Sequence, residues 1–284
     1  MALSTRLPSG IDNAGFIPEQ WAIDVLDIIK TKLVIASTFD MTWTIGKGKG
    51  DTVNVGILNE PTAREVTVGT PGVTNDIATG TKLQIVMNQW YEAPVVVDNM
   101  TDLQSQVDLV LKGKDASAYA IAKKIDYICG GYFSALYGSS GYGTDGVAID
   151  DNVLISAVEK LDEADAPDEG RVWVLDPSSK ADIMKIDKFT RLDYGAGDAV
   201  VTGMFRKNVY GAPVLISNNL TVGTTGNIGA YYQKRALAIA IQEDMLAYVV
   251  PEPLKHIKTV NTEALWGCLE MRDTFGLPIL TRKS

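Results

Sequence analysis

One long stretch of helical periodicity in the middle of the chain constrains the fold more than any other feature. Apolar side chains recur at helical spacing between residues 103 and 137, and lysines lie mostly on the other faces. The apolar face is formed by Val107, Leu111, Ala118, Ile121, Ile125, Ile128, Tyr132 and Leu136. At ~1.5 Å per residue, a helix over residues 103–137 would be roughly 50 Å long. Such a helix is too long for one compact core, so we predict a spine on which other elements pack.

The segment before this helix has the pattern of strands that flank a polar stretch. Apolar residues alternate in three runs, which are Val53, Val55 and Ile57, then Leu83, Ile85 and Met87, then Val95 and Val97. The intervening residues 59–81 contain few side chains that could be buried. A long two-stranded ribbon without a covered face is marginal in water. We therefore expect a neighbouring subunit to complete this ribbon.

The N-terminal part divides into an aperiodic arm and a helix. Residues 1–17 are rich in Gly, Pro, Ser and Asn, which favours an extended arm. Pro18 suits a first helical position and Glu19 a first turn, and the apolar residues that follow have helical spacing. We predict a helix over residues 18–36.

The second half of the chain alternates helix and strand patterns. An amphipathic helix is expected over residues 150–166, and an apolar strand at 171–175 precedes a helix with Asp176 as N-cap and Pro177 in its first turn. A strand punctuated by glycine is expected over 209–216. The run "RALAIAIQ", residues 235–242, predicts a strand buried on both faces, and further strand patterns lead to the C-terminus.

Charge and cysteine content exclude several functions. The 284 residues are 46% apolar and carry a net charge of −9, which argues against nucleic-acid binding through phosphate neutralisation. Cys129 and Cys268 are too few and too far apart for a disulfide framework or a zinc site, so we expect buried, reduced thiols. The sequence has neither a signal-peptide pattern nor an apolar run of ~18 residues. We expect a cytoplasmic globular protein with no membrane contact.

The stretch "TIGKGKGDTVNVG", residues 44–56, has the composition of a phosphate-binding loop. Its glycines surround Lys47 and Lys49. A P-loop needs Lys after its last glycine and a helix beyond it, whereas Gly50 is followed by Asp51 and a strand pattern. A hairpin turn is the better interpretation, because glycine permits the positive φ that tight hairpins require.

Other candidate sites for chemistry are weak. The glycines of "GYGTDG", residues 141–146, follow a helix instead of a strand, so they do not fit a dinucleotide site. His256 is the only histidine and has no nucleophile motif beside it. The acidic run 162–169 lacks the spacing of a calcium loop. We expect no catalytic residue, cofactor or metal, although a soluble enzyme with an unrecognised site near 141–146 or His256 stays an alternative.

Six phrases, in their order along the chain, resemble the major capsid proteins of tailed bacteriophages, which have the Hong Kong 97-type fold. These phrases are "FIPEQWAIDVLDIIKTKLVIAS", "GKGDTVNV", "VVVDNMTDLQS", "EGRVWVLDPSSKADIMKID", "GMFRKNVYGAPVLISNNL" and "ALWGCLEMRDTFGLPIL". They correspond to the opening helix, the start of the extended loop, the entry to the spine helix, two parts of the axial domain and the terminal strand. The resemblance spans nearly the whole chain.

This resemblance implies an α+β fold with four parts. An N-terminal arm and first helix would occupy residues 1–40, and the extended β-hairpin loop with its flanking strands residues 41–95. The peripheral domain, with the spine helix, would take residues 96–145 and 251–284. The axial domain, a central sheet flanked by helices, would take residues 146–250.

The resemblance also implies a function in a virion. The chain would assemble with itself into hexamers and pentamers of an icosahedral shell that encloses double-stranded DNA without reading its sequence. Assembly would take place in the host bacterial cytoplasm, with scaffolding, portal and decoration proteins as partners. An encapsulin-like compartment shell of the same fold is the alternative.

Subunit contacts are then expected from the extended loop and from the arm. The loop residues expected at these contacts are Lys47, Lys49, Glu60, Arg64, Glu65, Val66, Val68 and Asp76. In the arm we expect Arg6 and Phe16 to contact another subunit.

Overall fold

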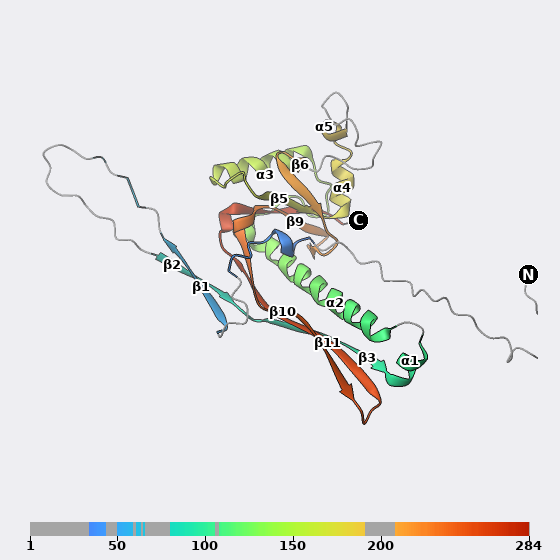
Figure 1. Ribbon diagram of the computed structural model, residues 1–284. Coiled ribbons are helices and arrows are strands. Elements are labelled where there is room, and N and C mark those ends of the chain that lie inside the picture. The colour runs from blue at the N-terminus through green and yellow to red at the C-terminus, as the bar shows by residue number, and fades with distance from the viewer. Residues whose placement is uncertain are drawn as a thin grey trace, which may run out of the picture.

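The protein is described by a computed structural model, which defines residues 34–43, 50–58, 61–63, 65, 80–105, 108–190 and 208–283. Figure 1 shows a body of helices and sheet from which two narrow groups of strands extend in different directions. Most of the predicted helix 18–36 lies outside the described residues. At its end the prediction is wrong, because Val34 and Ile35 are irregular and Ala36–Thr38 form a 3₁₀ turn.

The body is built on a seven-stranded mixed sheet. In order across the sheet its strands are β4 (Tyr142–Gly143), β12 (Gly276–Arg282), β9 (Gly226–Gln233), β5 (Arg171–Leu175), β7 (Ala212–Ile216) and β6 (Asn208–Val209), and β8 (Thr221–Val222) also pairs with β9. β12 runs parallel to β4, and β5 runs parallel to β7. The sheet therefore includes β12, although the sequence analysis placed residues 251–284 in the peripheral domain. The domain boundaries stay a prediction.

Both faces of this sheet are covered. All five residues of β5 are buried. Trp173 and Leu175 face a core formed with α3 (Asp151–Glu163), α4 (Pro177–Ile183) and α5 (Asp187–Thr190). Val172 and Val174 belong to a second core that includes residues of the long helix. The structure confirms the predicted helix at 150–166, the strand 171–175 and the Asp176 N-cap, whose side chain accepts from the Ser179 N–H.

A second, three-stranded antiparallel sheet extends from the body. Its order is β10 (Leu237–Glu252), β11 (Ile257–Glu270) and β3 (Gln89–Asp98). Residues 237–240 of β10 are fully buried, as the run "RALAIAIQ" predicted, although the strand continues to Glu252 with exposed residues. Figure 1 shows the long helix lying along this sheet.

The predicted spine helix is shorter than expected and is broken at both ends. α1 (Asn99–Gln104) precedes it, and the helix itself, α2, runs over Leu109–Gly131. Asp108 caps its start by accepting from the Leu111 N–H at 2.9 Å. After Gly131 the chain forms a 3₁₀ segment that leaves helical geometry at Leu136. The length is therefore roughly 35 Å instead of 50 Å.

The strand predicted over 209–216 is a hairpin. β6 and β7 pair antiparallel around Tyr210 and Gly211, which have φ values of 48° and 84°. Positive φ at both central residues is the geometry of the tight turn that joins two strands. A continuous strand was the wrong expectation, because these two residues reverse the chain.

The chain enters the body through residues 34–40, which are fixed to α2. Asp126, a buried residue of α2, accepts hydrogen bonds from the Ile35 N–H at 2.7 Å and the Ala36 N–H at 3.0 Å. An α-helix would use these N–H groups internally, so their capture by Asp126 explains why the predicted helix does not reach residue 36. Phe39 is buried against Phe133 and Tyr232.

Candidate subunit-contact surfaces

The root of the ribbon is packed on its own chain. β1 (Thr52–Leu58) and β2 (Gly80–Val86) pair antiparallel, as the alternation predicted. Val55 and Ile85 are buried against small residues of β10. At Gly267 of β11 a Cβ atom would lie 2.3 Å from the Val86 carbonyl oxygen, so only glycine lets the ribbon approach this closely. The described root of the ribbon thus has a covered face, which the sequence did not predict.

Only one of the predicted contact residues is described by the structure. Glu65 is exposed and lies in irregular backbone. The others lie outside the described residues, namely Lys47, Lys49, Glu60, Arg64, Val66, Val68 and Asp76 of the loop and Arg6 and Phe16 of the arm. Their role in contacts stays a prediction.

The three-stranded sheet is covered on one face by α2. Along β3, Tyr91 and Ala93 pack against the core that α2 lines, and Val95 lies close to Gly113 of α2. The two elements approach closely at that point, since a Cβ on Gly113 would lie 3.5 Å from a methyl carbon of Val95. The side chains that alternate with these must point to the opposite face.

That opposite face is covered near the body and open farther out. The ribbon root packs over Leu265 and Leu269 of β11. Beyond it, direct cross-strand partners place Val96, Thr259 and Val250 in one row and Pro94, Asn261 and Tyr248 in the next. We call the exposed apolar members of this surface the open face: Trp90, Val96, Leu246, Tyr248 and Val250. Trp90 is 72% exposed and Val96 is 59% exposed, which is unusual for side chains of this size on a sheet.

The open face also carries negative charge. Glu92 and Glu263 are direct cross-strand partners, and like charges in that position repel. Each accepts one neutral hydrogen bond, from Asn261 Nδ2 at 3.1 Å and from Trp90 Nε1 at 3.3 Å respectively. Among the described residues neither carboxylate forms an ion pair. Partial burial, Glu243 and Glu263 raise the pKa of Tyr248, which reports the negative potential at this surface.

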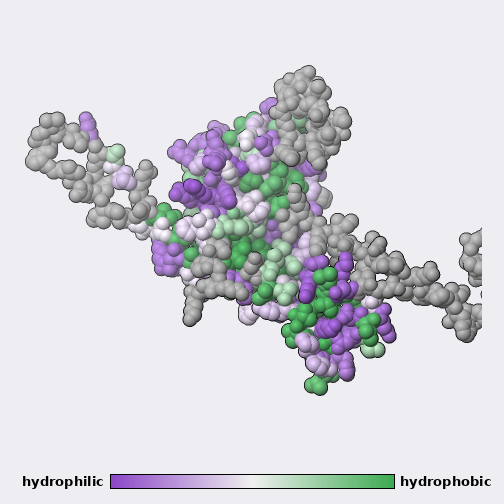
Figure 2. All heavy atoms as spheres, viewed as in Figure 1, coloured by the Kyte–Doolittle hydropathy of each residue, from purple (hydrophilic) through white to green (hydrophobic). Residues whose placement is uncertain are grey.

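The far end of this sheet bears further exposed apolar residues. We call Met100, Leu103 and Leu254 the apolar tip. The tip is held in shape by an ion pair of 2.8 Å between Lys258 Nζ and Asp102 Oδ2, which ties β11 to α1. Figure 2 shows apolar and polar residues interspersed at this end of the molecule. A fixed shape with exposed apolar side chains is suited to contact with another protein.

The alternative sites for chemistry have structural roles in the described protein. His256 is exposed in the turn between β10 and β11, with φ of 55°, and its carbonyl accepts from the Asn99 N–H. In "GYGTDG", Asp145 accepts from the backbone N–H groups of Thr224, Thr225 and Gly226 at 2.7–2.9 Å. These hydrogen bonds, led by that of Thr225, lower the pKa of Asp145. Asp145 thereby fastens the turn between β8 and β9.

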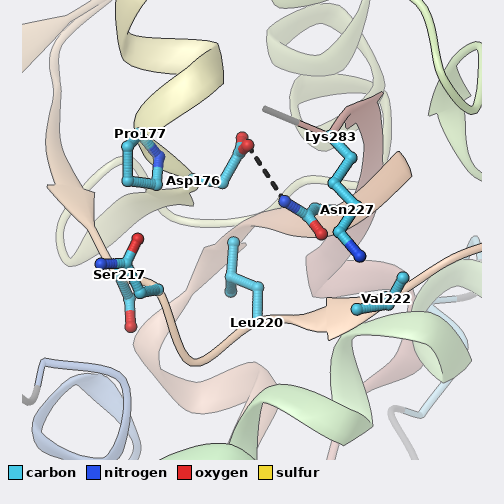
Figure 3. Close-up of a pocket in the computed structure, with 8 residues that line it drawn as sticks. Asp176, Pro177, Ser217, Leu220, Val222, Asn227 and Lys283 are labelled. Atoms are coloured by element: carbon cyan, nitrogen blue, oxygen red, sulfur yellow. Dashed lines mark hydrogen bonds between the residues drawn. The ribbon is translucent and has the colours of Figure 1, made fainter. Parts of the chain in front are cut away.

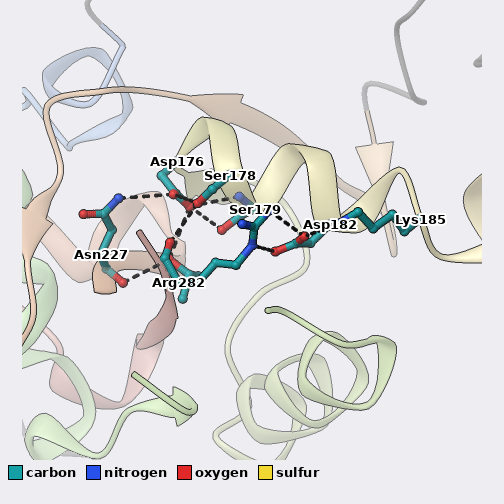
Figure 4. A network of polar contacts seen from close by, with 8 residues as sticks. Asp176, Ser178, Ser179, Asp182, Lys185, Asn227 and Arg282 are labelled. Carbon is teal, nitrogen blue, oxygen red and sulfur yellow. Dashed lines mark hydrogen bonds and ion pairs between the residues drawn. The ribbon is translucent and has the colours of Figure 1, made fainter. Parts of the chain in front are cut away.

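A small hollow of about 210 Å³ lies at the end of β5, beside Asp176, Asn227 and Lys283 (Figure 3). Asp176 accepts from Ser178, Ser179, Asn227 and Thr281, as Figure 4 shows in part. Burial by itself would raise the pKa of Asp176, but the hydrogen bonds from Ser178, Ser179 and Asn227 outweigh it and lower the pKa.

The same network ties α4 to the last strand. Asp182 binds the Arg282 guanidinium through both oxygens, at 2.6 and 2.9 Å. In Figure 4 Asp176 and Asp182 lie along one helix and point toward Arg282 and Asn227. A carboxylate that is ionised and fully occupied is poorly suited to act as a general base. This cluster therefore joins α4, β9 and β12.

The described part of the chain contains neither a group of metal ligands nor a membrane-spanning helix. No group of three or more His, Cys, Asp or Glu residues there is arranged to hold a metal ion. None of the helices described is both long and apolar enough to cross a bilayer.

The architecture is that of a capsid subunit of the Hong Kong 97 type. The structure of a protein of Mycobacterium phage Che8 matches with a TM-score of 0.78 and 21% identity, over 95% of this chain and 98% of that one. The capsid structure of cyanophage P-SCSP1u matches with a TM-score of 0.78 and 16% identity, over 98% and 99%. The structure of the mature capsid of bacteriophage PhiM1 matches with a TM-score of 0.72 and 12% identity, over 93% of this chain and 91% of that one. The expected α+β fold is thus confirmed.

A family model gives the more particular assignment. The model described as "Phage capsid protein" matches residues 95–253, which is more than half of the chain. The chain therefore belongs to this family of phage capsid proteins, as the resemblance of its sequence phrases predicted. No curated protein matches the chain.

The sequence prediction missed the open face, although a signal was present. In "QWYEAPVVVD", residues 89–98, both alternating sets contain apolar side chains. One set faces α2 and the other includes Trp90 and Val96. A strand that is apolar on both faces, and whose second face the described residues leave largely uncovered, indicates a surface that a partner covers.

Proposed function

We propose that this chain is the major capsid protein of a tailed bacteriophage, and that copies of it assemble into hexamers and pentamers of an icosahedral shell. The open face is the observation that supports this most directly. It presents several large apolar side chains on a rigid sheet whose opposite face is already packed. Surfaces of this kind are normally buried by another protein.

Closed rings follow from head-to-tail contacts. When one surface of a subunit binds a different surface of its neighbour, repetition closes a ring if the rotation permits. The ribbon is anchored at its root and directed away from the body (Figure 1), so it is placed to cross a neighbour. Each contact can be weak, because many act together in a shell. Loop residues such as Lys47 and Lys49 are candidates to pair with acidic positions such as Glu92 and Glu263.

The partners of this function are other virion proteins and the genome. Scaffolding, portal and decoration proteins would join the shell, which would assemble in the host cytoplasm. A chain of net charge −9 is suited to enclose DNA without binding it tightly. Its role is structural, not enzymatic. The solved structures named above come from phages, which favours a viral shell over a cargo compartment.

Electron microscopy of the purified protein, with and without co-expressed scaffolding protein, tests the proposal. Closed particles are expected from the natural sequence. Val96→Asp on the open face should abolish them. Val147→Asp serves as the matched control, since Val147 is 53% exposed and follows Gly146, whose N–H donates to the Thr281 carbonyl in the seven-stranded sheet. A small, uniform oligomer under every condition would contradict the proposed shell. If Val96→Asp and Val147→Asp formed particles equally well, the open face would not be a subunit contact.

A further inference from the structure

Two buried thiols meet between the long helix and the three-stranded sheet. Cys129 lies near the end of α2 and Cys268 near the end of β11. Their Sγ atoms are 3.6 Å apart, although the residues are separated by 139 positions in the sequence. Both thiols are free, and both belong to the same apolar core. Nothing in the proposed assembly function uses them.

The surroundings of Cys129 favour its protonated thiol. The hydrogen bond with Cys268 and burial raise the pKa of Cys129 well above its ordinary value, and the charge of Asp126 acts in the same direction. Burial and the two nearby sulfur atoms raise the pKa of Tyr132. Since the thiolate is the reactive form, we expect the Cys129 thiol to react slowly.

We propose that Cys129 and Cys268 form an intramolecular disulfide that staples α2 to β11 when the protein meets an oxidising environment. An S–S bond of about 2.05 Å requires the sulfur atoms, now 3.6 Å apart, to approach by roughly 1.5 Å. Thiols stay reduced in a cytoplasm and are oxidised outside it. In a shell subunit the thiols would thus be reduced during assembly and would form the disulfide after release from the host cell. Only this timing rests on the proposed function.

The oxidant is a small peroxide. Cys268 reacts first, because it is 6% exposed whereas Cys129 is fully buried. Its sulfur takes one oxygen from hydrogen peroxide to give a sulfenic acid, and one water is released. The Cys129 sulfur then attacks the Cys268 sulfur, the S–O bond breaks, and the oxygen leaves with the thiol proton as a second water. In total two thiols are oxidised by two electrons and one peroxide is reduced to two waters.

The consequence is a covalent tie across the main core. It joins the helix that backs the three-stranded sheet to the strand at the centre of that sheet. Closing a loop of this length restricts the unfolded chain strongly. The staple would therefore raise the resistance of each subunit to unfolding without adding any contact between subunits.

Thiol counting on the purified natural protein tests the staple. After treatment with hydrogen peroxide under native conditions, free thiols are blocked with N-ethylmaleimide in denaturant and the intact mass is measured. We expect two blocked thiols before oxidation and none after it. The oxidised protein should be about 2 Da lighter than the unblocked reduced protein and should give a Cys129–Cys268 linked peptide. The melting temperature should rise by roughly 5–10 °C and return on addition of dithiothreitol.

Cys129→Ala and Cys268→Ala are the matched controls. Neither should give a linked peptide or a melting temperature that responds reversibly to peroxide. Thiols that remain free in the folded natural protein but react once it is denatured would overturn the staple. So would conversion to sulfinic acid without a link, or disulfides that join two chains on a non-reducing gel. None of these readouts depends on whether particles form.

Discussion

The two sheets of this protein differ in how much of their surface the chain itself covers. The seven-stranded sheet has helices and core on both faces, so that every residue of β5 is buried. Among the described residues, the three-stranded sheet has α2 on one face and only the ribbon root on the near half of the other. The first is a complete folding unit, whereas the second leaves apolar surface for a partner. A chain can thus divide its strands between stability and association.

The largest expected effect contrasts two tryptophans. Trp173 is fully buried and stacked on Tyr231, with ring centroids 3.9 Å apart. Trp173→Ala should lower the free energy of unfolding by about 3–5 kcal/mol. Trp90→Ala, on the open face, should cost less than about 1 kcal/mol in the unassembled subunit. Urea denaturation of unassembled subunits measures both, and equal losses would break the distinction between the two sheets.

A smaller effect is expected at Asp126, which connects the entering chain to α2. Besides Ile35 and Ala36 it accepts from Asn219 Nδ2 at 3.2 Å. Asp126→Ala leaves these buried donors without an acceptor and should cost about 2–3 kcal/mol. Asp126→Asn keeps one acceptor oxygen and should cost less. Chemical denaturation of both variants decides this, and an unchanged midpoint for Asp126→Ala would show that residues 34–36 are held by apolar contacts alone.

The junction between the sheets should respond to pH. Burial and the neighbouring Asp273 raise the pKa of Glu270 to about 7. The folded state then binds a proton that the unfolded state has released, so this contribution to stability is complete below pH ~4.5 and is lost as the pH rises through 7. Between pH 5 and 8 the natural protein should lose about 1–2 kcal/mol of its free energy of unfolding through Glu270, a figure reduced for solvent screening. Glu270→Gln should not show this loss.

Urea midpoints at pH 5, 6, 7 and 8 measure this difference between the natural protein and Glu270→Gln. Asp273→Asn is the companion variant, because it removes one cause of the raised pKa and should move the transition to lower pH. Parallel pH profiles for all three proteins would show that Glu270 is ionised like an exposed carboxyl group.

The smallest effect on the subunit is expected at the apolar tip. Leu254 is 98% exposed, so Leu254→Ser should change the free energy of unfolding by less than about 0.5 kcal/mol. If the tip contacts another subunit, sedimentation should nevertheless show weaker association. A large loss of subunit stability would mean that the tip belongs to the folded core and not to a contact surface.

Much of the fold was predictable because its signals are local. The Asp176–Pro177 helix start, the apolar run of β5 and the alternation in β1, β2 and β3 each depend on a few neighbouring residues. The errors arose where distant residues intervene. Ile35 and Ala36 donate their N–H groups to Asp126 instead of to a helix, and the spine helix is interrupted near Asp108 and after Gly131.

The candidate contact residues show the same difference between local signals and contacts of distant residues. The sequence pointed to the polar loop, of which the structure describes only Glu65 among the predicted residues. It did not reveal the open face, since that surface exists only once the register of β10, β11 and β3 places Trp90, Val96 and Val250 on one side.

The sequence by itself determined the α+β composition, most of the strands and the resemblance to phage capsid proteins, because periodicity and helix caps act over a few residues. The tertiary structure alone decided which sheet faces are covered, that Gly267 admits the ribbon, and that Cys129 meets Cys268. These properties depend on contacts between segments far apart in the chain, and no local pattern encodes their distance.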